Sequence, residues 1–463
     1  MRQKQNSKRQ TKVTTNPFIT FLRRISQIFG DNRNFPYFCN VKLIKLQKMI
    51  SMKTKNFAKK ALVMVAMTLV FVTNAEAQQK RMMEFQMVMA MNETTYKNCL
   101  KQGNYKEAIT PLTTLINILD TTTIHKDTDV PENLIKESKG MYQYDLACCL
   151  ALTGQKKQAL QALEKSVDNG YKDYNNMLND NDLKTLRKDK KYKALLEIVK
   201  DRQPLSVLKK AGAYAKDSVK KENPFHYQPN ESMNLRMVRE YFKLDSVAGQ
   251  GDELSKIINL LHFVHDNMPH DGNHRAFAEM DAIDLYNYVK TTGKGINCRQ
   301  LAISLCEMYL ALGIPSRYVT CLPADPNDHE CHVINSVWSS QLQKWIWIDP
   351  TMDAWVMDEN GTMLGIAEVR ERLRNDLPLV LCETANWNHQ NKQSKEYYLD
   401  YYMAKNLYFF ACKKISRFNP ESDYRENPKD SEFVLFPTGY SSPNWKGCDT
   451  TTDSDLFWAK PEM

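Results

Sequence analysis

Hydrophobic positions recur with helical spacing from about residue 96 to residue 202. The small and apolar residues of one segment return 51 positions later, where Ala108, Leu112 and Leu115 correspond to Ala159, Leu163 and Ser166. A glycine separates the halves of each segment, Gly103 in the first and Gly154 in the second, as a tight turn between helices requires. The pattern predicts stacked helix pairs, with a third, degenerate pair over residues 178–199.

These helix pairs resemble tetratricopeptide repeats, with Leu146, Ala147, Ala159 and Leu163 at matching positions. The offset of 51 exceeds that family's period of about 34 residues, and an insertion near residues 121–140 would explain the difference. The resemblance implies a helical-repeat domain over residues 78–202. Such a domain either packs against the rest of the chain or binds a protein partner.

The remaining chain divides by composition. Residues 203–230 contain Pro204, Pro224 and Pro229 and are expected to form a linker with one short helix. Helical periodicity resumes at about residue 231, where a second domain is expected over residues 231–376. Residues 377–463 form an aromatic-rich extension of that domain, whose aromatic side chains build either core or a recognition surface for peptide or glycan.

The N-terminal region has the pattern of an export signal. A basic start at Met52, an apolar run over residues 61–72 and Ala75-x-Ala77 predict a signal peptide over residues 52–77. The apolar run is too short to span a bilayer, so we expect no stable membrane anchor and a periplasmic or extracellular protein. Residues 1–51 are interpreted as an over-extended, disordered start; the alternative is a cytoplasmic basic arm before a signal anchor.

The charge distribution argues against a nucleic-acid partner. The chain of 463 residues has a formal charge of +9, but residues 1–77 hold 15 basic side chains and only two acidic ones. Residues 78–463 therefore carry 48 basic and 52 acidic side chains. Since the main body is slightly acidic, it lacks the basic surface that nucleic-acid binding needs.

A cysteine lies at the start of a predicted helix. Residues 298–312 place Leu301, Leu305 and Leu312 on one face, and Gly313 and Pro315 end the helix. Unpaired amide groups and the positive end of the helix dipole stabilise a thiolate at such a position. Cys298 is therefore the candidate nucleophile.

Two predicted strands follow this helix. The alternation over residues 331–339 places His332 on one face of the first strand, and the second strand ends at Asp349. If residues 340–341 form the turn, His332 lies directly opposite Asp349; a longer turn would shift the pairing, although only by an even number of residues. The carboxylate can then orient the imidazole, which is typical of a catalytic triad.

Cys298, the Leu-Gly-Ile-Pro segment at 312–315, His332 and Trp-Ile-Asp349-Pro together resemble the transglutaminase-like superfamily of papain-type cysteine enzymes, across about residues 235–375. The resemblance implies an α+β domain with an antiparallel sheet, in which Cys298 is the nucleophile, His332 the base and Asp349 the third triad member. No alternating carboxylates of a calcium loop are present, and no metal or other cofactor is expected.

Further polar and cysteine residues lie close to the predicted site in sequence. His270, Asn273 and His274 precede the nucleophile and are candidates for lining the substrate site, although polar loop residues are often merely solvated. Cys321 and Cys331 bracket a loop before His332 and form either a disulfide or two reduced thiols.

The sequence as a whole favours an exported cysteine enzyme that cleaves or transfers an amide bond in a peptide or protein. A peptidase and an acyltransferase share the same acyl-enzyme, and only the acceptor differs. The competing hypothesis is a non-catalytic interaction protein that binds a partner through its helical repeats.

Overall fold

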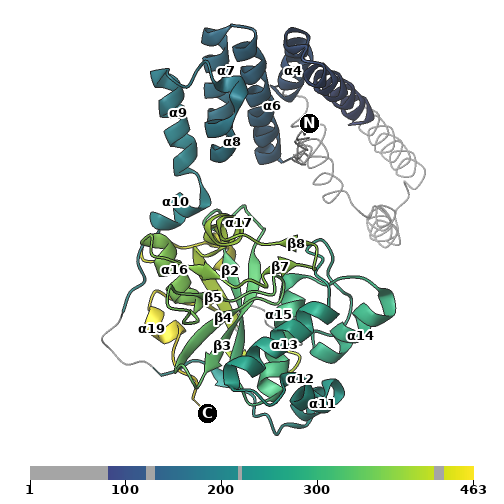
Figure 1. Ribbon diagram of the computed structural model, residues 1–463, viewed down its shortest axis with the longest axis vertical. Helices are drawn as coiled ribbons and strands as arrows, with labels where there is room; N and C mark the ends of the chain where they lie inside the picture. The colour runs from purple at the N-terminus through teal and green to yellow at the C-terminus, as the bar shows by residue number, and fades with distance from the viewer. Residues whose placement is uncertain (1–81, 121–130, 217–221, 422–431, 463) are drawn as a thin grey trace, which may run out of the picture. The chain divides into compact units, whose positions relative to one another are not determined.

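The computed structural model describes residues 82–120, 131–216, 222–421 and 432–462 (Figure 1). The chain forms two compact units, which meet in sequence between Asp201 and Arg202. The predicted N-terminal extension over residues 1–51 and the predicted signal peptide over residues 52–77 lie outside the described residues. None of the helices within the described ranges combines the length and apolarity that crossing a bilayer requires.

The first unit consists of consecutive helices (Figure 1). Residues 82–101 are helical and are followed by α4 (Tyr105–Asp120), α6 (Glu132–Leu152), α7 (Lys156–Asp168), α8 (Tyr174–Asn179), the short η2 (Asn181–Leu183) and α9 (Lys190–Asp201). Neighbouring helices pack on one another, α4 on α6 and α6 on α7.

The residues that recur in the sequence are the ones that this unit buries. Ala108, Leu112, Leu115, Ala159, Leu163 and Ser166 all have 0% exposed surface. Gly103 and Gly154 turn the chain between helices with φ angles of 75° and 82°, a region that favours glycine. The helix pairs are thus present, whereas their assignment to the tetratricopeptide family stays a prediction.

The expected insertion over residues 121–140 is partly helix. Its second half belongs to α6, within which Gly140 allows a close helix crossing. A Cβ atom at Gly140 would lie 3.1 Å from the carbonyl oxygen of Asn169, and the Ser166 hydroxyl donates to the Gly140 carbonyl at 2.6 Å. A larger residue would force α6 and α7 apart.

The second unit is built on a six-stranded sheet with the order β12-β11-β9-β2-β3-β4. Its strands are β2 (Ser316–Leu322), β3 (His332–Ser339), β4 (Lys344–Ile348), β9 (Phe409–Lys413), β11 (Glu432–Leu435) and β12 (Asp449–Thr451). All neighbours are antiparallel except β11 and β12, which are parallel. The predicted antiparallel sheet is therefore wrong at this edge, because residues 436–448 carry the chain back to the starting end of β11 before it pairs again.

Both faces of the sheet are covered. On one face, α15 (Cys298–Ala311) packs against β2 and β3 (Figure 1). Three further helices pack around α15, namely α11 (Met233–Phe242), α13 (Glu253–Asn267) and α14 (Ala282–Thr292). The short α12 (Leu244–Ala248) precedes α13. Successive β3 residues alternate between two cores, with Val333 in the core beside α15 and Ile334 in the core on the opposite face.

The segment predicted as a linker, residues 203–230, belongs to the second unit. Its helix α10 (Pro204–Lys209) packs against α16, and β1 (His226–Tyr227) pairs with β10 (Ile415–Ser416). Leu208 and Phe225 are 0% and 2% exposed. The prediction of a linker is wrong because its prolines flank short elements whose apolar side chains complete the core.

The C-terminal part of the chain completes the same unit. Its remaining elements are β5 (Val356–Met357), α16 (Ile366–Arg374), β6 (Val380–Leu381), β7 (Asn386–Trp387), β8 (Asn391–Lys392), α17 (Lys395–Tyr397), η3 (Tyr398–Met403), α18 (Ala404–Asn406), η5 (Pro443–Trp445) and α19 (Ser454–Phe457). Part of its aromatic residues build core, as one of the two alternatives expected, and the recognition surface stays a prediction. Tyr398 and Phe410 are fully buried, whereas Tyr397 and Tyr401 are exposed and stack on each other.

Candidate active site

Cys298 occupies the first position of α15. Asn297 caps the helix, because its side chain accepts a hydrogen bond from the Gln300 amide at 3.0 Å. The Gln300 side chain in turn accepts from the Asn297 amide at 3.3 Å, which completes a capping box. This local sequence fixes the start of the helix, so that the thiol lies where the helix dipole favours a negative charge.

His332 and Asp349 form a buried pair on the sheet beside α15. His332 begins β3 and is 1% exposed, and its Nε2 lies 2.8 Å from Oδ2 of Asp349. The Tyr398 hydroxyl donates to the same carboxylate oxygen at 2.6 Å, and the Thr351 amide donates to Oδ1 at 2.9 Å. Burial alone raises the pKa of Asp349, but the His332 charge and these hydrogen bonds outweigh it and lower the pKa.

The two residues meet in a register that differs from the prediction. Asn335 pairs with Ile348 and Ser339 with Lys344, so the turn between the strands contains the four residues 340–343. The expected two-residue turn is wrong, and Asp349 is offset by two positions from a place directly opposite His332. Because the offset is even, both side chains stay on the same face and still form the hydrogen bond.

The surroundings of Cys298 favour its thiolate. Burial raises the thiol pKa, but hydrogen bonding with His270 and His332 and the charge of the His332 imidazole lower it to about 5. At His332, burial opposes the positive charge, whereas Asp349 and the Cys298 thiolate favour it more strongly and raise the imidazole pKa. The pair is therefore a thiolate and an imidazolium at neutral pH.

The second nitrogen of His332 is not held by the carboxylate and is available to the thiol. Nδ1 is buried and has no aligned hydrogen-bond partner among the described residues. Catalytic hydrogen bonds are often long or poorly aligned before substrate binds, so this geometry is compatible with proton exchange at the neighbouring Cys298. The ring of Tyr402 packs edge-on against the imidazole at 5.2 Å and restricts its rotation.

Of the three further candidates for the site, one reaches the nucleophile. His270 interacts with the Cys298 sulfur. His274 instead places its Nε2 at 2.5 Å from the Tyr288 hydroxyl, and the exposed Asn273 donates its amide to Asp271. The structure therefore groups His270 with Cys298 and His332, and places the His274 and Asn273 contacts outside that group.

Three aromatic residues of the site escaped the sequence analysis. Tyr398 holds Asp349, Tyr402 packs on His332, and Trp387 donates its indole N–H to His270. They lie 38 or more positions after Asp349, and their spacing resembles that of ordinary core residues. Only the aromatic density around residues 397–402 marked this part of the chain.

The cysteines of the described residues are all free thiols. Of the two alternatives for Cys321 and Cys331, the structure has the reduced pair. Cys321 is fully buried opposite His332 in the β2 and β3 ladder, and burial raises its pKa well above the usual value. It is therefore an inert core residue rather than a second nucleophile.

One group of side chains in the first unit has the donor types of a metal site. Cys148, Asp180 and Asp182 place one potential ligand atom each within 4.8 Å of one another. Asp180 already accepts hydrogen bonds from the Tyr144 hydroxyl at 2.9 Å and the Asp182 amide at 2.9 Å. Its carboxylate thus has a structural role as a helix cap, and no chemistry is assigned to the group.

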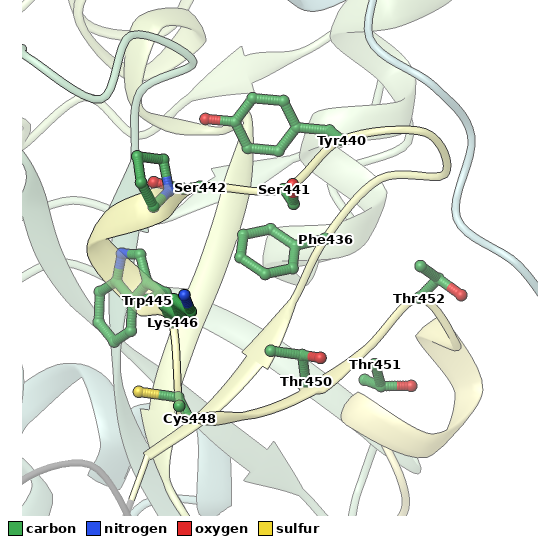
Figure 2. A pocket seen from close by; sticks show the side chains of 12 residues that line it. Phe436, Tyr440, Ser441, Ser442, Trp445, Lys446, Cys448, Thr450, Thr451 and Thr452 are labelled. Carbon is green, nitrogen blue, oxygen red and sulfur yellow. The ribbon is translucent and has the colours of Figure 1, made fainter.

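An open pocket lies at the β12 edge of the sheet, outside the cysteine site (Figure 2). It has a volume of about 800 Å³, and its lining includes Phe436, Tyr440, Trp445, Lys446 and Thr450. Cys298, His332 and Asp349 do not line it. The pocket offers aromatic and hydroxyl groups but none of the activated nucleophile chemistry found at Cys298.

A comparison with known protein families gives a match within the second unit. Residues 241–350 match the family described as transglutaminase-like superfamily. The chain contains a transglutaminase-like domain. That family consists mainly of cysteine-dependent enzymes, and the matched range ends directly after Asp349.

The comparisons give a different result for the first unit. Residues 126–207 match the family described as A/B hydrolase-like, N-terminal domain, so the tetratricopeptide resemblance is not confirmed.

A chloroplastic protein from Arabidopsis thaliana is 30% identical over 97 residues, which cover 21% of this chain and 25% of that protein. The chain thus spans about a quarter of the length of this relative. No solved structure is significantly similar to the chain.

Proposed function

We propose that the protein is an exported cysteine enzyme that hydrolyses an amide bond in a peptide or protein substrate. Cys298 acts as nucleophile, His332 as acid and base, and Asp349 as the group that orients His332. The main support is the thiol pKa of about 5 at a helix N-terminus, next to a buried imidazole that a carboxylate holds. A scaffold domain has no physical need for this combination.

The proposed reaction proceeds in two steps. The Cys298 sulfur attacks the substrate carbonyl carbon, a C–S bond forms, and the carbonyl π electrons move to the oxygen. When the carbonyl re-forms, the C–N bond breaks and the leaving amine takes a proton from Nδ1 of His332. Water then attacks the thioester and gives its proton to Nδ1, which releases the acid and restores the thiolate.

Hydrolysis is favoured over transfer to an amine. The two reactions share the thioester and differ only in the second nucleophile. Water is abundant outside the cell, where the predicted signal peptide would send the protein, and no feature of the sequence indicates a dedicated amine acceptor site. Transamidation is therefore the second outcome of the test below.

The first unit is proposed to contact a protein partner or the substrate. Helical-repeat units commonly serve this purpose through exposed helix faces. A purely non-catalytic interaction protein remains the competing hypothesis, and it predicts that replacement of Cys298 leaves the function intact.

The test is incubation of the mature protein with a diverse peptide mixture, with and without an added primary amine, followed by mass spectrometry. We expect shortened peptides with the wild type and none with Cys298→Ser. Amine adducts in place of shortened peptides would indicate transamidation. Identical product profiles for wild type and Cys298→Ser would contradict the proposed function.

A further inference from the structure

The chain segment before Cys298 is paired with a second segment that carries His270. The Ile296 amide donates to the Pro269 carbonyl at 3.0 Å, and the Asp271 amide donates to the Ile296 carbonyl at 2.8 Å. Gly295 permits this approach, because a Cβ atom there would lie 2.8 Å from the Pro269 oxygen. His270 is thereby held opposite Ile296, two positions before the nucleophile.

The turn between β7 and β8 fixes the backbone of His270. The Asn388 side chain accepts from the His270 amide at 2.8 Å and donates to the His270 carbonyl at 2.8 Å. Asn388 has a φ of 50°, a left-handed conformation that asparagine tolerates better than most residues. Because one side chain holds both the amide and the carbonyl of His270, this backbone has little freedom to shift.

The neighbouring Trp387 fixes the tautomer of the His270 ring. Its indole Nε1–H donates to Nδ1 of His270 at 2.9 Å. An indole nitrogen is only a donor, so Nδ1 must accept and the neutral ring carries its proton on Nε2.

The two imidazoles at Cys298 therefore have opposite surroundings. His332 has a carboxylate on one nitrogen, which favours the charged ring and suits proton transfer. His270 accepts the Trp387 N–H on Nδ1, which leaves Nε2 as the nitrogen that donates. Both interact with the sulfur, and the His270 hydrogen bond is the strongest influence that lowers the thiol pKa.

We propose that His270 is a second catalytic imidazole, which donates a fixed hydrogen bond from Nε2 to the thiolate and then to the oxyanion of the tetrahedral intermediate. This role rests on the proposed function of Cys298. His270 transfers no proton, and its N–H stays bonded while charge moves from sulfur to oxygen. Trp387 and Asn388 are positioning residues that act through His270.

The role has two measurable consequences. Loss of a donor to the thiolate raises the pH at which Cys298 becomes reactive. Loss of an oxyanion donor slows acylation by about 100-fold, even at a pH where the thiol is fully ionised. A merely structural residue would produce neither effect without a fall in melting temperature.

The experiment uses iodoacetamide to follow thiol ionisation and p-nitrophenyl acetate to follow acylation, both on the full chain. We expect His270→Ala to shift the alkylation midpoint upward by about one pH unit and to slow acylation at pH 8 by about 100-fold. His270→Gln, which keeps an N–H donor, should restore acylation to within about tenfold of wild type. The acylation rate of Trp387→Phe should lie between the rates of His270→Ala and His270→Gln. His274→Ala is the matched control from the same loop and should behave as wild type.

The outcomes separate this role from the proposed function. An unchanged alkylation midpoint and an unchanged acylation rate in His270→Ala overturn the role of His270. If His270→Ala does not fold, two results together overturn the role of His270. Trp387→Phe would behave as wild type, and His270→Gln would fail to acylate. Alkylation needs no substrate, so a shifted midpoint supports the His270 contact even if no peptide is cleaved. The absence of peptide cleavage would then count only against the proposed function.

Discussion

The pH dependence of Cys298 alkylation follows directly from the surroundings of the thiol. Hydrogen bonding with His270 and His332 overcomes the effect of burial and lowers the pKa from 9.0 to about 5. At pH 6 about nine-tenths of such a thiol is ionised, whereas about one in a thousand of an ordinary thiol is ionised. Ionisation alone would therefore make Cys298 about 900-fold more reactive at this pH.

Part of this gain is lost because a less basic thiolate is a weaker nucleophile. With a Brønsted slope of about 0.4–0.5, a pKa decrease of about four units lowers the intrinsic rate by about 40- to 100-fold. The net expectation is that Cys298 reacts about 10- to 20-fold faster than an ordinary thiol at pH 6. Above about pH 7.4 the order reverses, and Cys298 is the slower of the two.

The assay is iodoacetamide alkylation from pH 4 to pH 10, quantified on the Cys298 peptide by mass spectrometry. Labelling should fall as the pH decreases through about 5 and stay nearly constant up to about pH 9. Buried thiols provide an internal background, because burial raises the pKa of Cys306 and Cys412 to about 12. Burial and the nearby Cys298 charge raise the pKa of Cys331 as well, so it should label only at higher pH.

The matched variant is His332→Ala, which removes one of the two imidazoles. Its midpoint should rise by about one pH unit or more, because the thiolate loses both a hydrogen bond and a positive charge. A wild-type midpoint near pH 8 or 9 would refute this account of the thiol. So would a His332→Ala profile that coincides with that of the wild type.

Three further predictions test the supports of the site. Tyr398→Phe removes a 2.6 Å hydrogen bond to Asp349, and we expect p-nitrophenyl acetate acylation to slow by about tenfold, since a hydrogen bond to a charged group contributes about 1.5–3 kcal/mol; an unchanged rate would show that the hydroxyl does not support the carboxylate. Asp349→Asn should lower the His332 pKa and bring the upper limit of the thiolate-imidazolium range down toward neutral pH, and an unaltered pH profile would contradict the pairing. Leu305→Ala, at a fully buried position of α15, should decrease the free energy of unfolding by about 2–5 kcal/mol in urea denaturation, whereas a loss below about 1 kcal/mol would mean that α15 is less tightly packed than described.

The sequence predicted the elements of the site better than their pairing. The helix that begins at Cys298 and the strands that carry His332 and lead to Asp349 follow from local patterns, namely helical periodicity, the Gly313 stop and strand alternation. The register of β3 and β4 does not follow, because the length of the turn over residues 340–343 depends on its conformation. The even spacing of strand faces limited the error to two residues.

The contacts made by distant segments escaped prediction entirely. Trp387 and Tyr398 reach the site only because the chain after β4 folds back over the sheet, and no local periodicity encodes that path. The linker prediction failed for a related reason. The prolines of residues 203–230 interrupt any long hydrophobic periodicity, yet Leu208 and Phe225 are buried by elements far away in sequence.

The most direct test of the account is the site of acylation by p-nitrophenyl acetate. After rapid acid quenching and peptide mapping, we expect one acetyl group on Cys298 in the wild type. Cys298→Ala should carry none at this peptide and should release no burst of nitrophenol, while its melting temperature stays close to that of the wild type. An equal burst in both proteins, or acetylation confined to surface lysines, would contradict a nucleophilic Cys298.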